Sequence, residues 1–185
     1  NKIHLLVITE GASAQYNDSE MKQVRKQSCK KSSQFLGISS INFLDYPDMK
    51  LDTIPQLKIN QSIEKEIRKI KPEIVYTTPN HDLNSDHRIL HESTLVASRP
   101  QSGVKKILSY EIPGFVKKSI HPNVFENIEL ELTYKLKAMR SYKSEIEKFP
   151  HPRSLKAIEN LSIHRGIESG LKNAEAFQLL TSIKK

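Results

Sequence analysis

The amino-acid sequence predicts an α/β domain in which helices cover both faces of a parallel sheet. The main observation is periodicity, because stretches with the period of a strand alternate with stretches of helical period over the first 112 residues. Such alternation is typical of right-handed βαβ units. The second observation is length, since 185 residues are enough for one compact domain. No internal repeat or linker-like stretch interrupts the pattern, so we expect residues 1–185 to form a single domain.

The expected elements alternate along most of the chain. Strands are expected over 3–9, 41–46, 73–78, 104–112, 125–130 and 174–183, the last at a sheet edge, and helices over 18–36, 59–70, 87–98, 153–165 and through Leu132, Leu136, Met139 and Ile146. The helix over 59–70 has the clearest signal, because isoleucines recur at helical spacing and Pro72 ends it. Gly37 is expected to end the first helix.

Composition narrows the classes of partner. Lys and Arg number 29 against 21 Asp and Glu, which gives a formal net charge of +8 and a pI of about 9.5. The basic residues occur in scattered pairs and the chain has no Trp, which favours a solvated basic surface over an anionic small-molecule partner and over a nucleic-acid partner. No apolar run approaches the roughly 20 residues of a membrane span. Cys29 is the only cysteine, so no intrachain disulfide forms and a reducing, cytoplasmic location is expected.

One loop concentrates polar side chains where the sheet of an α/β protein binds ligands. Residues 81–87 read His-Asp-Leu-Asn-Ser-Asp-His and follow an expected buried strand. Asp and His are metal ligands and acid/base groups near neutral pH, so the loop is a candidate metal or catalytic site. An Asx turn with a helix N-cap and an ordinary exposed His87 explains the same residues equally well.

Other candidates carry a weaker signal. His87 and His91 are four residues apart on one expected helix, but no Glu follows the first histidine as in a zinc-protease helix, so a packed or capping His91 is the better interpretation. Arg25 and Arg99 could clamp an anion, although each is more often a surface residue. Cys29 is interpreted as a small core residue.

With these residues considered together, the chain resembles the LmbE-like, or PIG-L, zinc-dependent deacetylases. The most specific segment is Asp82-Leu83-Asn84-Ser85-Asp86-His87-Arg88, and supporting segments extend from Leu6–Gly11 to Ala174–Phe177. The resemblance implies a Rossmann-like three-layer sandwich with a mainly parallel sheet. It also implies hydrolysis of the N-acetyl group of a neutral or anionic N-acetylglucosamine-type conjugate, with Zn²⁺ as cofactor and no nucleic-acid partner.

The same resemblance assigns roles to single residues. His87 falls on a zinc-binding histidine of the family, and Asp86 would steer His87 or its loop. Asn84 stands where many relatives have a histidine that helps to polarise the substrate carbonyl, and it can still donate a hydrogen bond. Arg25, with Arg99 as a further candidate, would face the substrate. The interpretation requires the His87 ring to lie at the carboxyl ends of the strands with an acidic group beside it.

The chain departs from the family at its start. The His-Pro-Asp-Asp-Glu segment that supplies the family's other zinc ligands and its general base is absent from the sequence, so the chain resembles a member lacking the first strand and helix. We therefore expect weak zinc binding and little activity from the chain alone. The alternatives are an inactive sugar-binding relative or a basic nucleic-acid-binding α/β domain, and an oligomer is compatible with the sequence.

Overall fold

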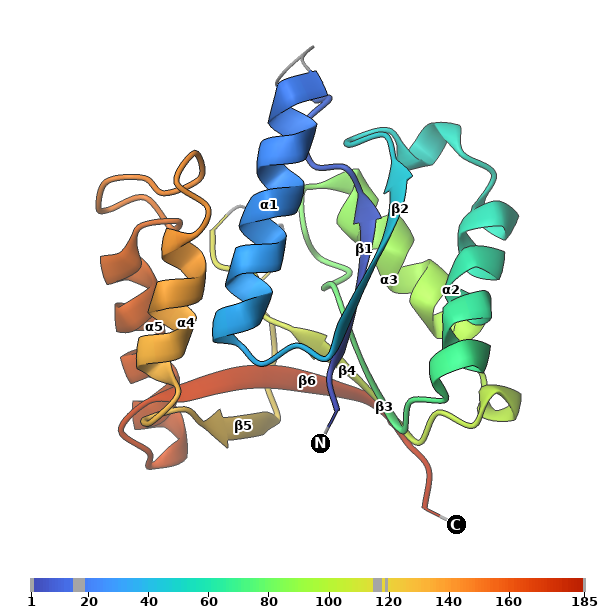
Figure 1. Ribbon diagram of the computed structural model, residues 1–185. Coiled ribbons are helices and arrows are strands. Elements are labelled where there is room, and N and C mark those ends of the chain that lie inside the picture. Colours follow the sequence, from blue (N-terminus) through green and yellow to red (C-terminus); the bar gives the residue numbers. More distant parts are fainter. Residues whose placement is uncertain (1, 15–18, 115–117, 119, 185) are drawn as a thin grey trace. The chain divides into compact units, whose positions relative to one another are not determined.

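The computed structural model describes residues 2–14, 19–114, 118 and 120–184. The chain divides into two compact units, one of residues 1–48 and 126–175 and the other of residues 49–125 and 176–185. The elements of both units are labelled in Figure 1. The single domain expected over residues 1–185 stays a prediction.

The first unit is built on a βαβ motif. Its elements are β1 (His4–Thr9), α1 (Ser19–Phe35), β2 (Ser40–Tyr46), α4 (Leu132–Arg140) and α5 (Leu155–Ser169). Strands β1 and β2 pair in parallel, and α1 connects them. Helix α4 contacts both α1 and α5. Gly37 adopts a φ of 65°, a left-handed conformation that glycine tolerates, so α1 ends where the sequence predicts.

The second unit carries the loop that the sequence singles out. Its elements are η1 (Leu51–Thr53), α2 (Gln56–Ile70), β3 (Ile74–Thr77), α3 (Ser85–Ala97), η2 (Pro100–Ser102), β4 (Lys106–Tyr110) and the greater part of β6 (Ala174–Ser182). Together with β5 (Val124–Asn127) the strands form a sheet of order β3-β4-β6-β5. Strands β3 and β4 are parallel, so their carboxyl ends lie at the same edge.

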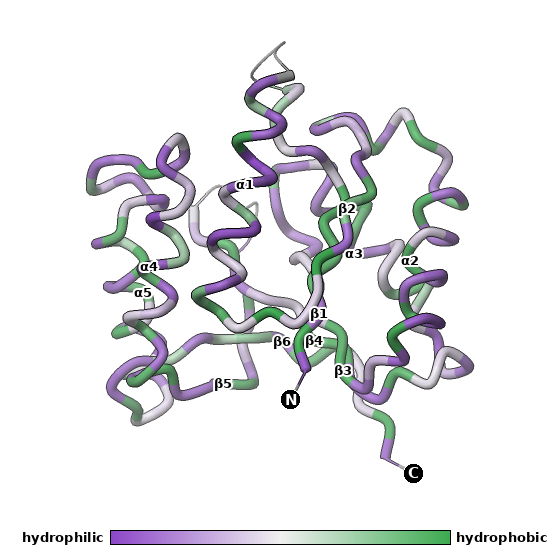
Figure 2. Tube along the Cα trace, in the orientation of Figure 1, coloured by the Kyte–Doolittle hydropathy of each residue, from purple (hydrophilic) through white to green (hydrophobic). Residues whose placement is uncertain are grey.

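Helix α2 is amphipathic, and its apolar side determines how it packs. Ile59, Ile63 and Ile67 are buried, and polar residues occupy the positions between them, as the alternating colours along α2 in Figure 2 show. The buried stripe explains why α2 packs against α3. Lys71 ends the helix in a left-handed conformation with a φ of 52°, immediately before Pro72.

Four expectations about the fold are wrong in detail. The four-stranded sheet is mixed, because β6 runs antiparallel to β4, and β6 lies between β4 and β5 instead of at an edge. Strand β3 is itself at the edge of that sheet, and Ile74 and Tyr76 are exposed there. Helix α4 ends at Arg140, before Ile146 is reached.

No helix in the described ranges has both the length and the apolar character needed to cross a bilayer.

Candidate functional site

The loop between β3 and α3 is held by short-range hydrogen bonds of its own side chains. The Asp82 carboxylate accepts the Asn84 N–H at 2.8 Å through Oδ1, which closes an Asx turn. Asn84 is the N-cap of α3, and its Oδ1 accepts the Asp86 N–H at 2.8 Å. The turn and cap that the sequence allows are therefore both formed, and they deliver His87 to the first turn of α3.

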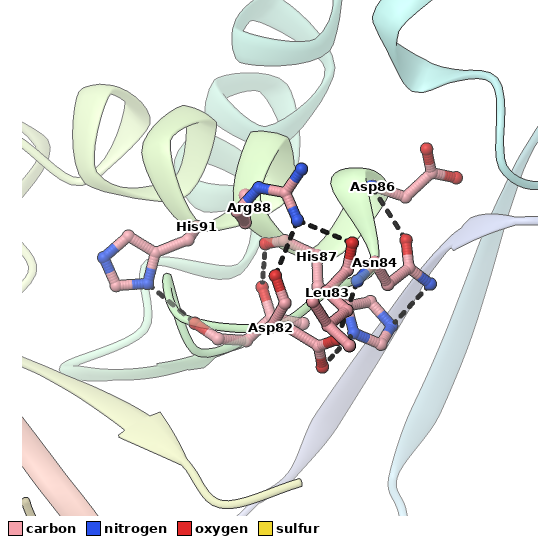
Figure 3. A network of polar contacts seen from close by, with 8 residues as sticks. Asp82, Leu83, Asn84, Asp86, His87, Arg88 and His91 are labelled. Atoms are coloured by element: carbon pink, nitrogen blue, oxygen red, sulfur yellow. Dashed lines mark hydrogen bonds and ion pairs between the residues drawn. The ribbon is translucent and has the colours of Figure 1, made fainter. Parts of the chain in front are cut away.

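His87 is nevertheless not an ordinary exposed residue. Its Nδ1 lies 2.8 Å from Oδ2 of the Asp82 carboxylate, as Figure 3 shows. Because a carboxylate oxygen only accepts, Nδ1 carries the proton and the lone pair of Nε2 is available. The side chain is 32% exposed, and Asn84 Nδ2 lies 3.5 Å from Nε2. This is the arrangement in which a histidine binds a metal, with a carboxylate fixing the tautomer from behind.

Asp82 is buried, and both of its carboxylate oxygens are used. The negative charge of Asp82 also acts electrostatically on the phenol of Tyr110, the last residue of β4. Burial, together with the charge of Asp82, raises the pKa of Tyr110 to about 12. The Tyr110 phenol is therefore protonated throughout the neutral range. Asp82 and Tyr110 mark the adjacent carboxyl ends of two parallel strands.

Thr78 connects the end of β3 to two turns of α3. Its Oγ1 donates to the His87 carbonyl at 2.7 Å, and its own carbonyl accepts a hydrogen bond from His91 Nδ1 at 2.7 Å. His91 is buried, and in Figure 3 its ring points away from His87. The interpretation of His91 as a packed histidine is confirmed.

The Asp86 side chain bonds the backbone of η1, whereas the sequence suggests that it orients His87 or its loop. Its Oδ1 accepts the Leu51 N–H at 3.0 Å, so the buried carboxylate faces η1, and Asp82 bonds the His87 ring. Asp82 was not assigned this role from the sequence. The signal that could have identified it is helix geometry, because adjacent helical residues do not face each other whereas a residue of the preceding turn can return to the ring.

The two candidate arginines lie elsewhere. Arg99 is 65% exposed and pairs with Glu64 at 3.5 Å. It follows Ala97, the last residue of α3, which lies about 15 Å along the helix from His87. Arg25, in the first unit, is largely buried and forms an ion pair with Glu145, which also binds Arg153. The structure therefore does not bring Arg99 to His87, and the substrate roles of both arginines stay predictions.

The first unit has a buried carboxylate at the end of β1. Glu10 accepts hydrogen bonds from the backbone N–H groups of Ala12 at 2.8 Å and Ser13 at 3.1 Å, and Lys22 Nζ lies 3.4 Å from its other oxygen. Burial by itself raises the pKa of Glu10, but the hydrogen bonds from Ser13 and Ala12 and the charge of Lys22 outweigh it, so the pKa is lowered. The Glu10 carboxylate thus fixes the backbone conformation of the loop that follows β1.

Within the described residues, no three His, Cys, Asp or Glu side chains are gathered closely enough to share a metal ion. The donor chemistry of His87 fits one metal ligand, since its Nε2 is available and its Nδ1 is fixed by Asp82.

Comparison with known proteins identifies the class to which this fold and site belong. The family model of the GlcNAc-PI de-N-acetylases, PIG-L, matches residues 1–98. The match covers more than half of the chain, so the chain belongs to this family. No curated protein sequence matches the chain.

Solved structures share the fold at low sequence identity. N,N'-diacetylchitobiose deacetylase from Pyrococcus horikoshii is 18% identical with a TM-score of 0.77, over 97% of this chain and 73% of its own. The zinc-inhibited form of a teicoplanin deacetylase is 11% identical with a TM-score of 0.71, over 100% and 89%. A 4-carboxy-2-hydroxymuconate hydratase from Pseudomonas putida is 16% identical with a TM-score of 0.77, over 100% and 86%. At such identities the likeness establishes the fold alone, and that fold occurs with more than one chemistry.

Proposed function

We propose that the chain is a metal-dependent N-deacetylase domain that removes the acetyl group from an N-acetylglucosamine-type sugar conjugate. Membership of the de-N-acetylase family supports the reaction class. The observation that carries the proposal is the Asp82–His87 pair at the carboxyl ends of two parallel strands, where α/β proteins bind ligands.

In this proposal His87 is a ligand of the catalytic metal, through Nε2. A bound Zn²⁺ would lower the pKa of a water molecule and polarise the amide carbonyl. His87 is one ligand, and the family's further ligands belong to a His-Pro-Asp-Asp-Glu segment that the 185 residues do not contain. The proposed role of this chain's residues is therefore to hold and orient the groups of the site.

Three side chains support this assignment from the second unit. Asp82 fixes the protonation of the His87 ring, and Asp86 holds η1 against the start of α3. Asn84 Nδ2 lies beside Nε2 of His87, so its N–H can donate to a substrate carbonyl placed there. Asn84 and Asp86 are thus proposed as positioning and hydrogen-bonding residues, and neither is proposed as the base.

The decisive experiment measures acetate release from an N-acetylglucosaminyl conjugate, with and without a chelator. The assay uses the 185-residue chain and the same chain preceded by the family's His-Pro-Asp-Asp-Glu segment. We expect chelator-sensitive release that His87→Ala abolishes, while His164→Ala, at an exposed histidine of α5, leaves it unchanged. Release that persists in the His87 variant, or that a chelator does not affect, would refute the metal role.

The alternative function is sugar binding without hydrolysis. The same two preparations can distinguish it from the proposed deacetylase. Calorimetric titration with the N-acetylated conjugate, run beside the acetate assay, would show saturable binding and no product if the chain were an inactive relative. Saturable binding with no acetate from either preparation would therefore overturn the proposed hydrolase.

A further inference from the structure

We infer that Arg88 is a positioning residue, whose guanidinium fixes the backbone of residues 82–83 and thereby determines which ring nitrogen of His87 carries the proton. The consequence for turnover rests on the proposed function. The effect on the ring itself does not, because it follows from the geometry of the loop.

The contacts of Arg88 are directed at main-chain oxygens. Its Nη1 donates to the carbonyl of Asp82 at 2.6 Å and to the carbonyl of Leu83 at 2.7 Å, as Figure 3 shows. One guanidinium nitrogen has two N–H bonds, so Nη1 can serve both carbonyls at once. Hydrogen bonds from a charged donor are among the stronger ones in proteins.

These two carbonyls lie in the loop between β3 and α3, outside the helical hydrogen-bond pattern. The loop's own bonds use the carboxylate of Asp82, with Oδ1 on the Asn84 N–H and Oδ2 on His87 Nδ1. A carboxylate can make both bonds only if its backbone is correctly oriented. Arg88 holds that orientation through its hydrogen bonds to the carbonyls of Asp82 and Leu83.

Arg88 acts on His87 indirectly. The two residues are adjacent in α3, so their side chains leave the helix about 100° apart and do not face each other. The path is therefore from the guanidinium to the loop backbone, from the backbone to the Asp82 carboxylate, and from the carboxylate to Nδ1. The first and last links are hydrogen bonds of 2.6 Å and 2.8 Å, and the middle link is the covalent side chain of Asp82.

The matched control is His91 on the same helix. His91 also donates a side-chain hydrogen bond to a main-chain carbonyl near the end of β3, that of Thr78, at 2.7 Å. It makes no contact with the carbonyls of residues 82 and 83 that Arg88 binds. Loss of either side chain removes a helix-to-loop bond, but only loss of Arg88 is expected to release Asp82.

The test is ¹⁵N NMR of the histidine rings in the 185-residue chain, at about pH 8, where an unperturbed imidazole is neutral. The His87 signal is assigned by its loss in His87→Gln. We expect the Nδ1–H form in the unmodified protein, its loss in favour of the Nε2–H form in Arg88→Met, and its recovery in Arg88→Lys. His91→Gln should retain the Nδ1–H form even if it lowers thermal stability.

An unchanged Nδ1–H form in Arg88→Met would overturn the inference. If that variant does not fold, Arg88→Gln takes its place, because its shorter amide cannot reach both carbonyls, and an unchanged ring there overturns the inference equally. Where acetate release is measurable, Arg88→Met should lower it roughly tenfold, the lower end for loss of an outer-sphere partner. A shifted ring in Arg88→Met, with no acetate release even from the chain preceded by the His-Pro-Asp-Asp-Glu segment, would refute the deacetylase and leave the role of Arg88 intact.

Discussion

Replacing Asp82 by Asn tests whether this carboxylate fixes the His87 ring. In the structure Asp82 acts twice as an acceptor, toward the Asn84 N–H through Oδ1 and toward His87 Nδ1 through Oδ2, both at 2.8 Å. An amide of the same shape has one acceptor oxygen and one NH₂ donor. If its oxygen stays on Asn84, its NH₂ faces His87 Nδ1, and the ring proton must move to Nε2. If the amide is reversed, its NH₂ faces the Asn84 N–H, and the turn loses its hydrogen bond.

The magnitude follows from the carboxylate charge, because in either case a hydrogen bond to a charged acceptor is replaced by a neutral one or lost. A hydrogen bond to a charged group contributes about 1.5–3 kcal/mol, and the partial exposure of His87 favours the lower end. We therefore expect Asp82→Asn to lower the free energy of unfolding by about 1.5 kcal/mol. For a chain of this length that is a fall in Tm of roughly 3–6 °C.

The assay combines urea unfolding with ¹⁵N NMR of the His87 ring. Asp52→Asn is the control, since it removes one negative charge from an exposed position of η1 in the same unit and should change stability by no more than about 0.5 kcal/mol. A variant that keeps the Nδ1–H form and loses no more stability than the control would show that Asp82 does not set the ring.

Two further changes test the loops at the ends of β3 and β1. Asn84→Ala removes the N-cap of α3 and should cost about 1 kcal/mol in urea unfolding, whereas Asn84→Asp keeps the acceptor and should cost much less; equal losses would contradict the cap. The pKa of Glu10 is lowered in the folded protein, so its contribution to stability is present above its ordinary pKa and is lost as the pH falls through the folded value. Glu10→Gln should therefore weaken the protein at neutral pH and reduce the fall in stability on acidification, and an unfolding curve with the same pH dependence as the unmodified protein would contradict the role of Glu10.

The order of strands and helices could be predicted because periodicity is a local property. Isoleucines at helical spacing identify α2, and its end is fixed by Lys71 and Pro72. The position of β6 between β4 and β5 depends on pairing with residues far away in the chain, which periodicity does not report. The exposure of Tyr76 has the same origin, because an apolar strand looks alike in sequence at the edge and in the middle of a sheet.

The sequence identifies the polar loop before α3 as a candidate site, but it does not predict the direction of the loop's side chains. The sequence places Asp82, Asn84 and Asp86 at alternate positions before His87, and nothing in that spacing says which carboxylate bonds the ring. In the structure α3 begins at Ser85, so Asp86 already has helical geometry and diverges from His87 by about 100°. Asp82 precedes the cap, and the Asx turn brings it back toward Nδ1. The start of the helix therefore divides the two carboxylates by role: the one inside the helix holds η1, and the one before it fixes the imidazole.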